Sequence, residues 1–375
     1  MNSSGIRAQL EDTRFFQRSS QLFHQYKRFL PVASFVAGFS WDSFTLTRID
    51  LWSDNLILLS YLLLLGLLIT IVNFVQDQVI TRPLVLRMQN IYPLAIQFFL
   101  GGLFSSFMVF YFKSSALSKN WLFLLLLLLI LVGNEFIENR LANLKLQFSL
   151  FFLATFSFLI FFLPVLVRAM NRLTFIASGL LSLSLVLGLL YFIFRKSKRK
   201  SRSELHHTIL IISFLFLLIN VFYFLNWIPP VPLALKEGGI YHHASRSDDG
   251  YLLKFEKGAW YHFWKSSDDV YHYQQGDTVF CFAAVFAPTR LNKNIFHHWQ
   301  VYDNQKGIWN TTDRLGYRIY GGRDGGYRGF TFKRNIQEGK WRVNVETEEG
   351  QLLGRISFSL LFNADTRKPL KTIVR

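Results

Sequence analysis

The sequence predicts a membrane α-helical bundle of about seven transmembrane helices followed by an all-β sandwich domain. Hydrophobic residues make up 51% of its 375 residues and are concentrated in roughly the first three fifths of the chain. Apolar segments recur there at the length of about 20 residues that a helix needs to cross a bilayer. Beyond Pro229 the apolar residues instead alternate with polar ones, which is typical of half-buried strands. We therefore expect a cytoplasmic amphipathic tail (1–30), a transmembrane helical domain (31–228), a linker (229–240) and an exported β-sandwich domain (241–375).

The tail and the apolar segments define the membrane part. The tail carries aromatic and basic side chains with the spacing of a helix that lies in the membrane interface. The expected crossings are residues 31–46, 55–75, 92–112, 120–136, 146–167, 173–194 and 208–228. The first crossing is the weakest, because it is short for a hydrocarbon core of roughly 30 Å and carries Asp42.

A basic segment between the last two crossings sets the orientation. Residues 195–202 (RKSKRKSR) hold six basic residues in eight positions, and short basic loops stay on the cytoplasmic side. With an inner N-terminus, nine further basic residues lie inside: Arg7, Arg14, Arg18, Lys27, Arg28, Arg82, Arg87, Arg140 and Lys145. The outer loops hold five: Arg48, Lys113, Lys119, Arg168 and Arg172. The distribution of fifteen to five places the chain beyond Pro229 outside the cytoplasm.

The region after the proline-rich run at 229–232 has the pattern of an antiparallel sandwich. The residues Trp341, Val343 and Val345 alternate with polar ones, as do Ile356, Phe358 and Leu360, with a turn at 348–350. Residues 278–286 are apolar on both faces and are expected to form a central strand. Further expected strands are 295–302, 307–312, 317–320 and 327–333, with 251–255 and 259–264 as weaker candidates. Seven short strands over so short a region predict a β-sandwich.

Several runs of residues resemble a known family. In the C-terminal part they are 276–282 (GDTVFCF), Ala287-Pro288, His297-His298-Trp299, 325–329 (GGYRG) and 339–343 (GKWRV). They resemble the module catalogued as domain of unknown function 2914, over roughly residues 241–361. Residues 38–46 (GFSWDSFTL) and 134–136 (NEF) are similar to runs in bacterial multi-pass membrane proteins that carry this module. The resemblance implies a bacterial membrane protein and transfers no catalytic residue.

The composition argues against several kinds of partner. The formal net charge of +17 lies largely in loops that the positive-inside rule explains, so membrane lipid is the expected partner and nucleic acid is not. The single Cys281 excludes an intramolecular disulfide. Histidine pairs occur at 206–207, 242–243 and 297–298. Adjacent residues in a strand point to opposite faces and cannot both bind one ion, so we expect no metal and no cofactor.

The glycine-rich segment 321–329 is the candidate ligand-binding site of the exported domain. A phosphate loop leads into a helix N-terminus, whereas strands are expected on both sides of this segment. One interpretation is a flexible connection whose glycines allow φ above zero. The other is an anion or glycan surface in which Arg323 and Arg328 donate bidentate hydrogen bonds and Tyr327 or Trp299 offers a stacking face. Arg314 and Arg318 would be further donors, and Trp299 also suits a core position.

Acidic residues near the bilayer form two more candidate groups. Asp42 and Asp50 lie in and just after the first crossing, and Glu135 and Glu138 lie at and after the end of the fourth. An Asp at a helix centre costs on the order of 3 kcal/mol for insertion. Such groups therefore pair with basic neighbours at the interface or line a transport or catalytic pathway.

We consider three hypotheses for function. The first is a non-enzymatic inner-membrane protein whose periplasmic sandwich binds an envelope component, either a protein or an anionic glycan. The lack of a recognisable nucleophile, metal or cofactor motif favours it. The second is a transporter or channel, which would place Asp42 and Glu135 in one continuous polar cavity. The third is a membrane enzyme acting on a lipid-linked glycan, with Asp42 and Asp50 as its outer carboxylate pair.

Overall fold

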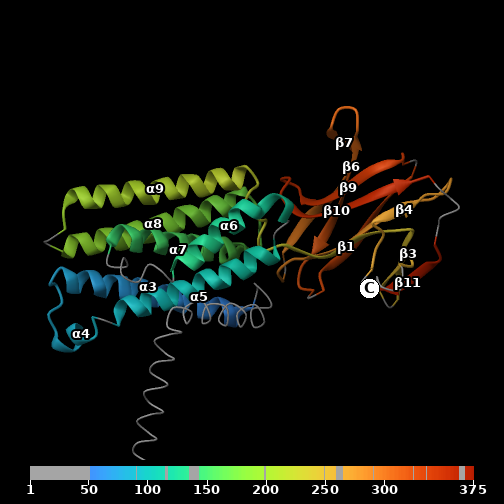
Figure 1. Cartoon of the computed structure of the whole chain (residues 1–375). Helices are drawn as coiled ribbons and strands as arrows, with labels where there is room; N and C mark the ends of the chain where they lie inside the picture. Colours follow the sequence, from blue (N-terminus) through green and yellow to red (C-terminus); the bar gives the residue numbers. More distant parts are fainter. Residues whose placement is uncertain are drawn as a thin grey trace, which may run out of the picture. The chain divides into compact units, whose positions relative to one another are not determined.

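The computed structural model describes most of the chain beyond the first crossing. It covers residues 51–89, 91–114, 117–134, 143–197, 200–248, 250–258, 265–289, 291–323, 325–334, 336–362 and 368–375. The expected tail, first crossing and strand 259–264 lie outside these residues. The acidic candidates Asp42, Asp50, Glu135 and Glu138 lie outside them too. Along the described chain, helices come first and strands follow (Figure 1).

Seven helices occur in the described residues. They are α3 (Trp52–Gln76), α4 (Pro83–Arg87), α5 (Tyr92–Lys113), α6 (Leu117–Asn134), α7 (Leu144–Val167), α8 (Arg172–Lys196) and α9 (Arg202–Phe224). Six coincide with the second to seventh expected crossings, and the short α4 was not expected. Five are long and apolar enough to cross a membrane, namely α3, α7, α8, α9 and residues Ala95–Lys113 of α5. Helix α6 contributes a shorter apolar stretch, Asn120–Ile130.

Helix α7 forms the core of the bundle. It packs against α3, α5, α8 and α9, and its residues Phe152 and Phe156 are fully buried. Gly179 of α8 permits this packing, because a Cβ at that position would lie 2.8 Å from the Phe156 ring. On α9, Phe214 and Leu217 are exposed. An exposed apolar face on a helix that is apolar all round is typical of a membrane span.

The described strands form three sheets. The central sheet has the order β1 (Ala234–Tyr241), β5 (Val279–Phe286) and β8 (Tyr327–Lys333). The large sheet has the order β4 (Val270–His272), β10 (Leu352–Leu361), β9 (Gly339–Thr347), β6 (Asn292–Asp303) and β7 (Ile308–Tyr320). The small sheet has the order β11 (Leu370–Val374), β3 (Gly250–Glu256) and β2 (His243–Ser247). Only β4 and β10 pair in parallel among these strands.

The central sheet is covered on both faces. On one face, Cys281 of β5 belongs to a buried cluster with Trp299 and Trp341 of the large sheet. On the other face, Phe282 of β5 packs with Phe255 of the small sheet. Strand β5 is therefore central and apolar on both sides, as its sequence predicts. The expected sandwich is formed by the central and large sheets, and the small sheet adds a third layer.

Strand β1 occupies much of the segment that was expected to be a linker. The adjacent Gly238 and Gly239 hide this strand from pattern analysis, because glycine is depleted within strands. Here they permit a close approach, since a Cβ at Gly239 would lie 2.4 Å from the Cβ of Ser267. The ordered β domain thus begins at Ala234 and not at residue 241.

The structure corrects one expectation for the large sheet and confirms another. The separate strands expected at 307–312 and 317–320 are one strand, β7, which pairs with β6 along its whole length. The turn expected at 348–350 is present: Gly350 has φ of +78° and donates its amide to the Thr347 carbonyl at 3.0 Å.

Candidate anion-binding site

The outer face of the large sheet, turned away from the central sheet, carries polar side chains in two rows across the strands. Side chains alternate between the faces of a strand, so these residues point away from core neighbours such as Val343. The first row is Thr311, Gln300, Arg342 and Ser357, and the second is Arg314, His298, Asn344 and Arg355. We call the part of this surface formed by Gln300, Arg342, Asn344, Arg355 and Ser357 the Arg342–Arg355 face.

The two arginines of this face are held by neutral partners. Arg342 donates from Nε to Gln300 Oε1 at 2.7 Å, and Arg355 donates from Nε to Asn344 Oδ1 at 2.8 Å. Within the residues that the structure describes, neither guanidinium has a carboxylate at salt-bridge distance. Both bonds use Nε alone. As far as the described residues go, the terminal nitrogens of both arginines are therefore available to an external acceptor.

Burial and charge both act on these two arginines. Burial lowers the pKa of Arg342, and the nearby charge of Arg355 lowers it further. Burial also lowers the pKa of Arg355. Arg342 lies directly opposite Ser357, two residues along the strand from Arg355, which makes the arginines a diagonal pair with Cα atoms roughly 7–8 Å apart. Two like charges so placed favour an anion between them.

Arg314, on the edge strand β7 of the same sheet, is neutralised within the protein. Its Nε donates to Glu346 Oε1 at 2.8 Å. A terminal nitrogen donates to the carbonyls of Thr347 and Glu348 at 3.1 and 3.0 Å. The guanidinium also lies 4.0 Å from the centroid of the Phe296 ring. Arg314 thus differs from the other two arginines by its internal carboxylate.

Aromatic rings border the Arg342–Arg355 face. The Arg342 guanidinium lies 4.2 Å from the centroid of Trp309, and the Trp309 and Tyr302 rings are 5.1 Å apart. This cation–π contact orients the guanidinium. Gln300 Oε1 also accepts a bond from Asn344 Nδ2 at 3.3 Å. The face therefore combines fixed guanidinium donors, side-chain amides and aromatic rings.

The glycine-rich segment brings two of its predicted residues together. The Arg323 guanidinium lies 5.1 Å from the centroid of the Tyr327 ring. Arg328 pairs with Ala284, which faces the small sheet, whereas Tyr327 pairs with Val285, which faces the large sheet. Arg328 is consequently on the opposite face of the central sheet from Tyr327.

Trp299 does not serve as the stacking platform considered for it. Its side chain is 0% exposed, and its indole donates to Thr331 Oγ1 at 3.1 Å. The physical reason is strand phase: Trp299 points between the sheets, where its ring has no face open to a ligand.

The histidine pair in β6 is divided between the two faces of the large sheet. His297 is buried against Thr331 Oγ1, 2.9 Å from its Nδ1, and burial lowers its pKa to about 3. His298 lies on the outer face, with its Nδ1 3.3 Å from Glu346 Oε2.

A buried acid–histidine cluster links the small sheet to β4, and sequence reasoning missed it because its members are far apart in the chain. His272 Nδ1 lies 2.8 Å from Glu256 Oε2, and Lys265 Nζ lies 3.0 Å from Asp268 Oδ1. His242 Nε2 lies 3.4 Å from Glu256 and 3.7 Å from Asp268. Burial raises the pKa of Asp268 to about 6. In the described ranges, no three His, Cys, Asp or Glu side chains are arranged to hold a metal ion.

The helical part contains a polar cluster that sequence reasoning also missed. Lys200, from the basic segment, donates to Asn73 Oδ1 at 2.8 Å and lies 3.4 Å from Asp77 Oδ2. Asn73 in turn donates to Gln147 Oε1 at 2.8 Å. The cluster connects α3, α7 and the segment before α9. Isolated polar residues within apolar helices, such as Asn73 and Gln147, are the signal that could have indicated it.

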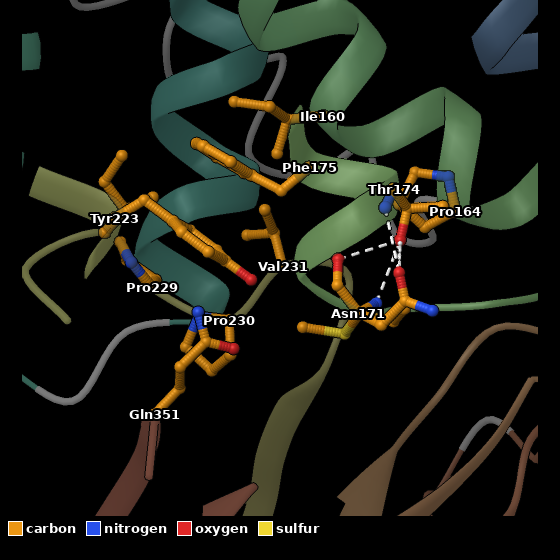
Figure 2. Close-up of a pocket in the computed structure, with 12 residues that line it drawn as sticks. Ile160, Pro164, Asn171, Thr174, Phe175, Tyr223, Pro229, Pro230, Val231 and Gln351 are labelled. Carbon is orange, nitrogen blue, oxygen red and sulfur yellow. Dashed lines mark hydrogen bonds between the residues drawn. The ribbon is translucent and has the colours of Figure 1, made fainter. Parts of the chain in front are cut away.

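Figure 2 shows a small cavity near the connection between α7 and α8. Its volume is about 20 Å³, room for roughly one water molecule. The rings of Phe175 and Tyr223 stack with centroids 3.7 Å apart. Asn171 and Thr174 exchange hydrogen bonds of 2.8 and 2.9 Å that cap α8. This cavity is too small for an organic ligand.

The long apolar helices and the three sheets define a membrane-spanning protein with a C-terminal domain of β-sheets. Within that domain, residues 292–360 match the family described as "Protein of unknown function (DUF2914)". This confirms the resemblance over part of the expected range, and the matched residues contain the whole Arg342–Arg355 face. No curated protein matches the chain.

The comparison with solved structures returns a weak likeness. The structure of "Pseudomonas fluorescens alkylpurine DNA glycosylase AlkC bound to DNA containing an abasic site analog" is 11% identical, with 75% of this chain and 82% of that chain covered. Its TM-score is 0.18. A similarity at this level supports no conclusion about the fold or function of this chain.

Proposed function

We propose that this chain is a bacterial inner-membrane protein whose β domain lies on the extracytoplasmic side and binds an anionic envelope component on the Arg342–Arg355 face. One observation carries the proposal: two neighbouring guanidinium groups on an outer sheet face have neutral amides as their partners. Arginine forms its strongest contacts with carboxylates and phosphates through paired N–H donors. Two arginines that have no carboxylate partner among the described residues are suited to take that carboxylate from a ligand.

The surroundings of the arginines favour an acidic glycan over a compact ion. Arg355 and Ser357 are exposed side by side on β10, so a ligand can lie along the sheet. Gln300 and Asn344 supply fixed amides, and Trp309 and Tyr302 supply aromatic rings at one border. Hydroxyl groups, ring faces and carboxylates recur along an acidic polysaccharide, and this combination matches the three kinds of group on the face. An acidic protein segment is the competing occupant.

The location rests on the charge distribution. The six basic residues at 195–202 precede the last helix, and the positive-inside rule keeps such a segment in the cytoplasm. Helix α9 then carries the chain outward, and β1 begins ten residues after α9 ends at Phe224. An extracytoplasmic position is where an envelope glycan would meet the domain.

Retention of the full-length protein on immobilised polysaccharide tests the proposal. Protein in detergent micelles is passed over polygalacturonate and over its uncharged methyl ester. We expect retention on the acidic polymer alone, reversed by salt because the contacts are charged and exposed. Arg342→Gln with Arg355→Gln should abolish it.

Arg314→Gln with Glu346→Gln is the matched control, because it removes a guanidinium from the same sheet together with the carboxylate that balances it and so leaves the net charge unchanged. This control should be retained like the parent. Equal retention of the double variant and the parent would show that the ligand binds elsewhere.

A further inference from the structure

We propose that a second surface binds the phosphate headgroups of anionic lipids in the bilayer that holds the helices. This surface is the Arg–Tyr ladder, formed by Arg318 and Tyr320 at the end of β7, by Arg323 in the segment before β8, and by Tyr327, the first residue of β8. This proposal and the proposed function have one premise in common, namely that the helices anchor the protein in a membrane. It does not depend on the ligand of the Arg342–Arg355 face.

The four side chains of the ladder form a row in which two arginines flank two tyrosine rings. The Arg318 guanidinium lies 5.6 Å from the centroid of Tyr320, and the Tyr320 and Tyr327 rings are 5.9 Å apart. Arg323 completes the ladder 5.1 Å from Tyr327. Both arginines are exposed, and Tyr320 is 49% exposed. In the part of the chain that is described, neither Arg318 nor Arg323 has an acidic partner.

Strand register places the ladder at the end of the domain where the chain arrives from the last helix. Tyr327 pairs with Val285, which pairs with Leu235, the second residue of β1. Gly322, next to Arg323, donates its amide to the Ala287 carbonyl at 3.0 Å, directly after β5. The start of β1, the end of β5 and the start of β8 therefore lie at the same end of the domain. The short segment 225–233 joins that end to α9.

The large sheet also places the ladder at the end of the domain that is nearest the helices. Tyr320 pairs with Asn292, and the adjacent Lys293 donates from Nζ to the Met170 carbonyl at 2.9 Å. Met170 belongs to the connection between α7 and α8, two apolar helices of membrane-spanning length. The ladder thus lies at the end of the β domain that contacts the α7–α8 connection and that is joined to α9. On β6, Gln300 of the Arg342–Arg355 face lies six residues beyond Asn294, which pairs with Arg318 of the ladder. The face and the ladder are therefore about 20 Å apart.

The chemistry of the ladder fits this position. Guanidinium groups bind phosphate oxygens through two parallel N–H bonds, and tyrosine is enriched at the level of lipid headgroups. A cationic surface next to a bilayer is attracted by anionic lipids and weakly by zwitterionic ones. A ladder that is built of both residue types, exposed, and without an acidic partner among the described residues therefore selects the phosphate of an anionic headgroup.

Hydrogen exchange of the full-length protein in nanodiscs tests this inference. The readout is amide exchange over residues 317–330 in phosphatidylcholine alone and in phosphatidylcholine with added phosphatidylglycerol. We expect exchange to be several-fold slower with phosphatidylglycerol, and this slowing to vanish at high salt. Soluble glycerol phosphate, added to phosphatidylcholine discs, separates a headgroup in the bilayer from free phosphate and should give no slowing.

Two double variants complete the experiment. Arg318→Gln with Arg323→Gln should exchange equally fast in both bilayers, while the buried β5 amides remain as protected as in the parent. Arg342→Gln with Arg355→Gln should retain the lipid-dependent slowing, which separates this inference from the proposed function. Identical exchange of the parent in the two bilayers would overturn the proposal. So would slowing caused by soluble phosphate or by polygalacturonate in place of the anionic lipid.

Discussion

Arg355 donates a hydrogen bond from Nε to the side-chain oxygen of Asn344, its direct cross-strand neighbour, at 2.8 Å. An asparagine at this position holds the guanidinium without cancelling its charge. Asn344→Asp keeps the shape of the side chain and supplies an internal carboxylate. We therefore expect the full-length variant to elute from polygalacturonate at a much lower salt concentration than the parent.

A second substitution controls for net charge. Asn294→Asp adds the same charge at an exposed position of β6, six residues before Gln300 and so about 20 Å along the strand. This separation exceeds the Debye length of about 8 Å at physiological ionic strength, so its elution should match that of the parent. Equal weakening by both variants would mean that retention follows overall charge and not the Arg342–Arg355 face.

The start of β1 sets the smallest β domain that folds. Residues 234–238 pair with β5 at one edge of the central sheet, and Glu237 forms an ion pair with Arg375 at 2.6 Å. We expect a fragment of residues 231–375 to be soluble and to unfold cooperatively in urea. A fragment of residues 239–375 should unfold at lower urea or aggregate, because the edge of β5 is uncovered. Equal midpoints for the two fragments would contradict the role assigned to β1.

Two tryptophans of the large sheet should differ in their contribution to stability. Trp341 is 1% exposed and donates its indole N–H to the Gln337 carbonyl at 2.8 Å, whereas Trp309 is only half-buried on the outer face. Trp341→Ala should lower the free energy of unfolding by about 3–5 kcal/mol. Trp309→Ala should lower it by about 1 kcal/mol or less. Urea unfolding of fragment 231–375 measures both, and similar losses would refute the assignment of inner and outer faces.

Much of this fold follows from the spacing of apolar residues. The crossings from 55–75 onward and the strands around Trp341 and Phe358 were predicted because burial on one face imposes a period on the sequence. Strand β1 was not predicted, because Gly238 and Gly239 interrupt the alternation of apolar and polar residues. The small sheet was only partly anticipated, since its strands are short and pair with distant partners, as β3 does with β11.

The candidate site was less predictable than the fold. Alternation along β9 and β10 indicates that Arg342 and Arg355 point outward, but it does not say which residues of β6 lie beside them. That depends on register between strands about 40 residues apart in the chain and on the choice of Asn344 and Gln300 as neutral partners. The role of Trp299 was equally open. A single tryptophan in a strand does not reveal whether another sheet covers it, so both a ligand-stacking position and a core position were considered.

The acid–histidine cluster should give the β domain a measurable pH dependence. Burial raises the pKa of Asp268 from 3.8 to about 6 in the folded protein, so the folded state binds this proton more tightly than the unfolded chain does. The resulting stabilisation is complete below the unfolded pKa of 3.8 and is lost as the pH rises through about 6.

Asp268→Asn removes this contribution while leaving the neighbouring groups Lys265, Glu256, His242 and His272 in place. Relative to the variant, fragment 231–375 of the parent should lose on the order of 2 kcal/mol of stability as the pH rises from about 4 to about 7. Urea titrations at several pH values measure the difference. A difference that is constant with pH would mean that Asp268 titrates alike in the folded and unfolded chain.

The central claim is that α9 carries the β domain out of the cytoplasm, where an envelope ligand can reach the Arg342–Arg355 face. Fusions of a reporter that is active only in the periplasm test it most directly. A fusion after Arg375 should be active, and a fusion at Lys198 within the basic segment should be silent. Activity at Lys198 together with silence after Arg375 would place the β domain in the cytoplasm and contradict the account.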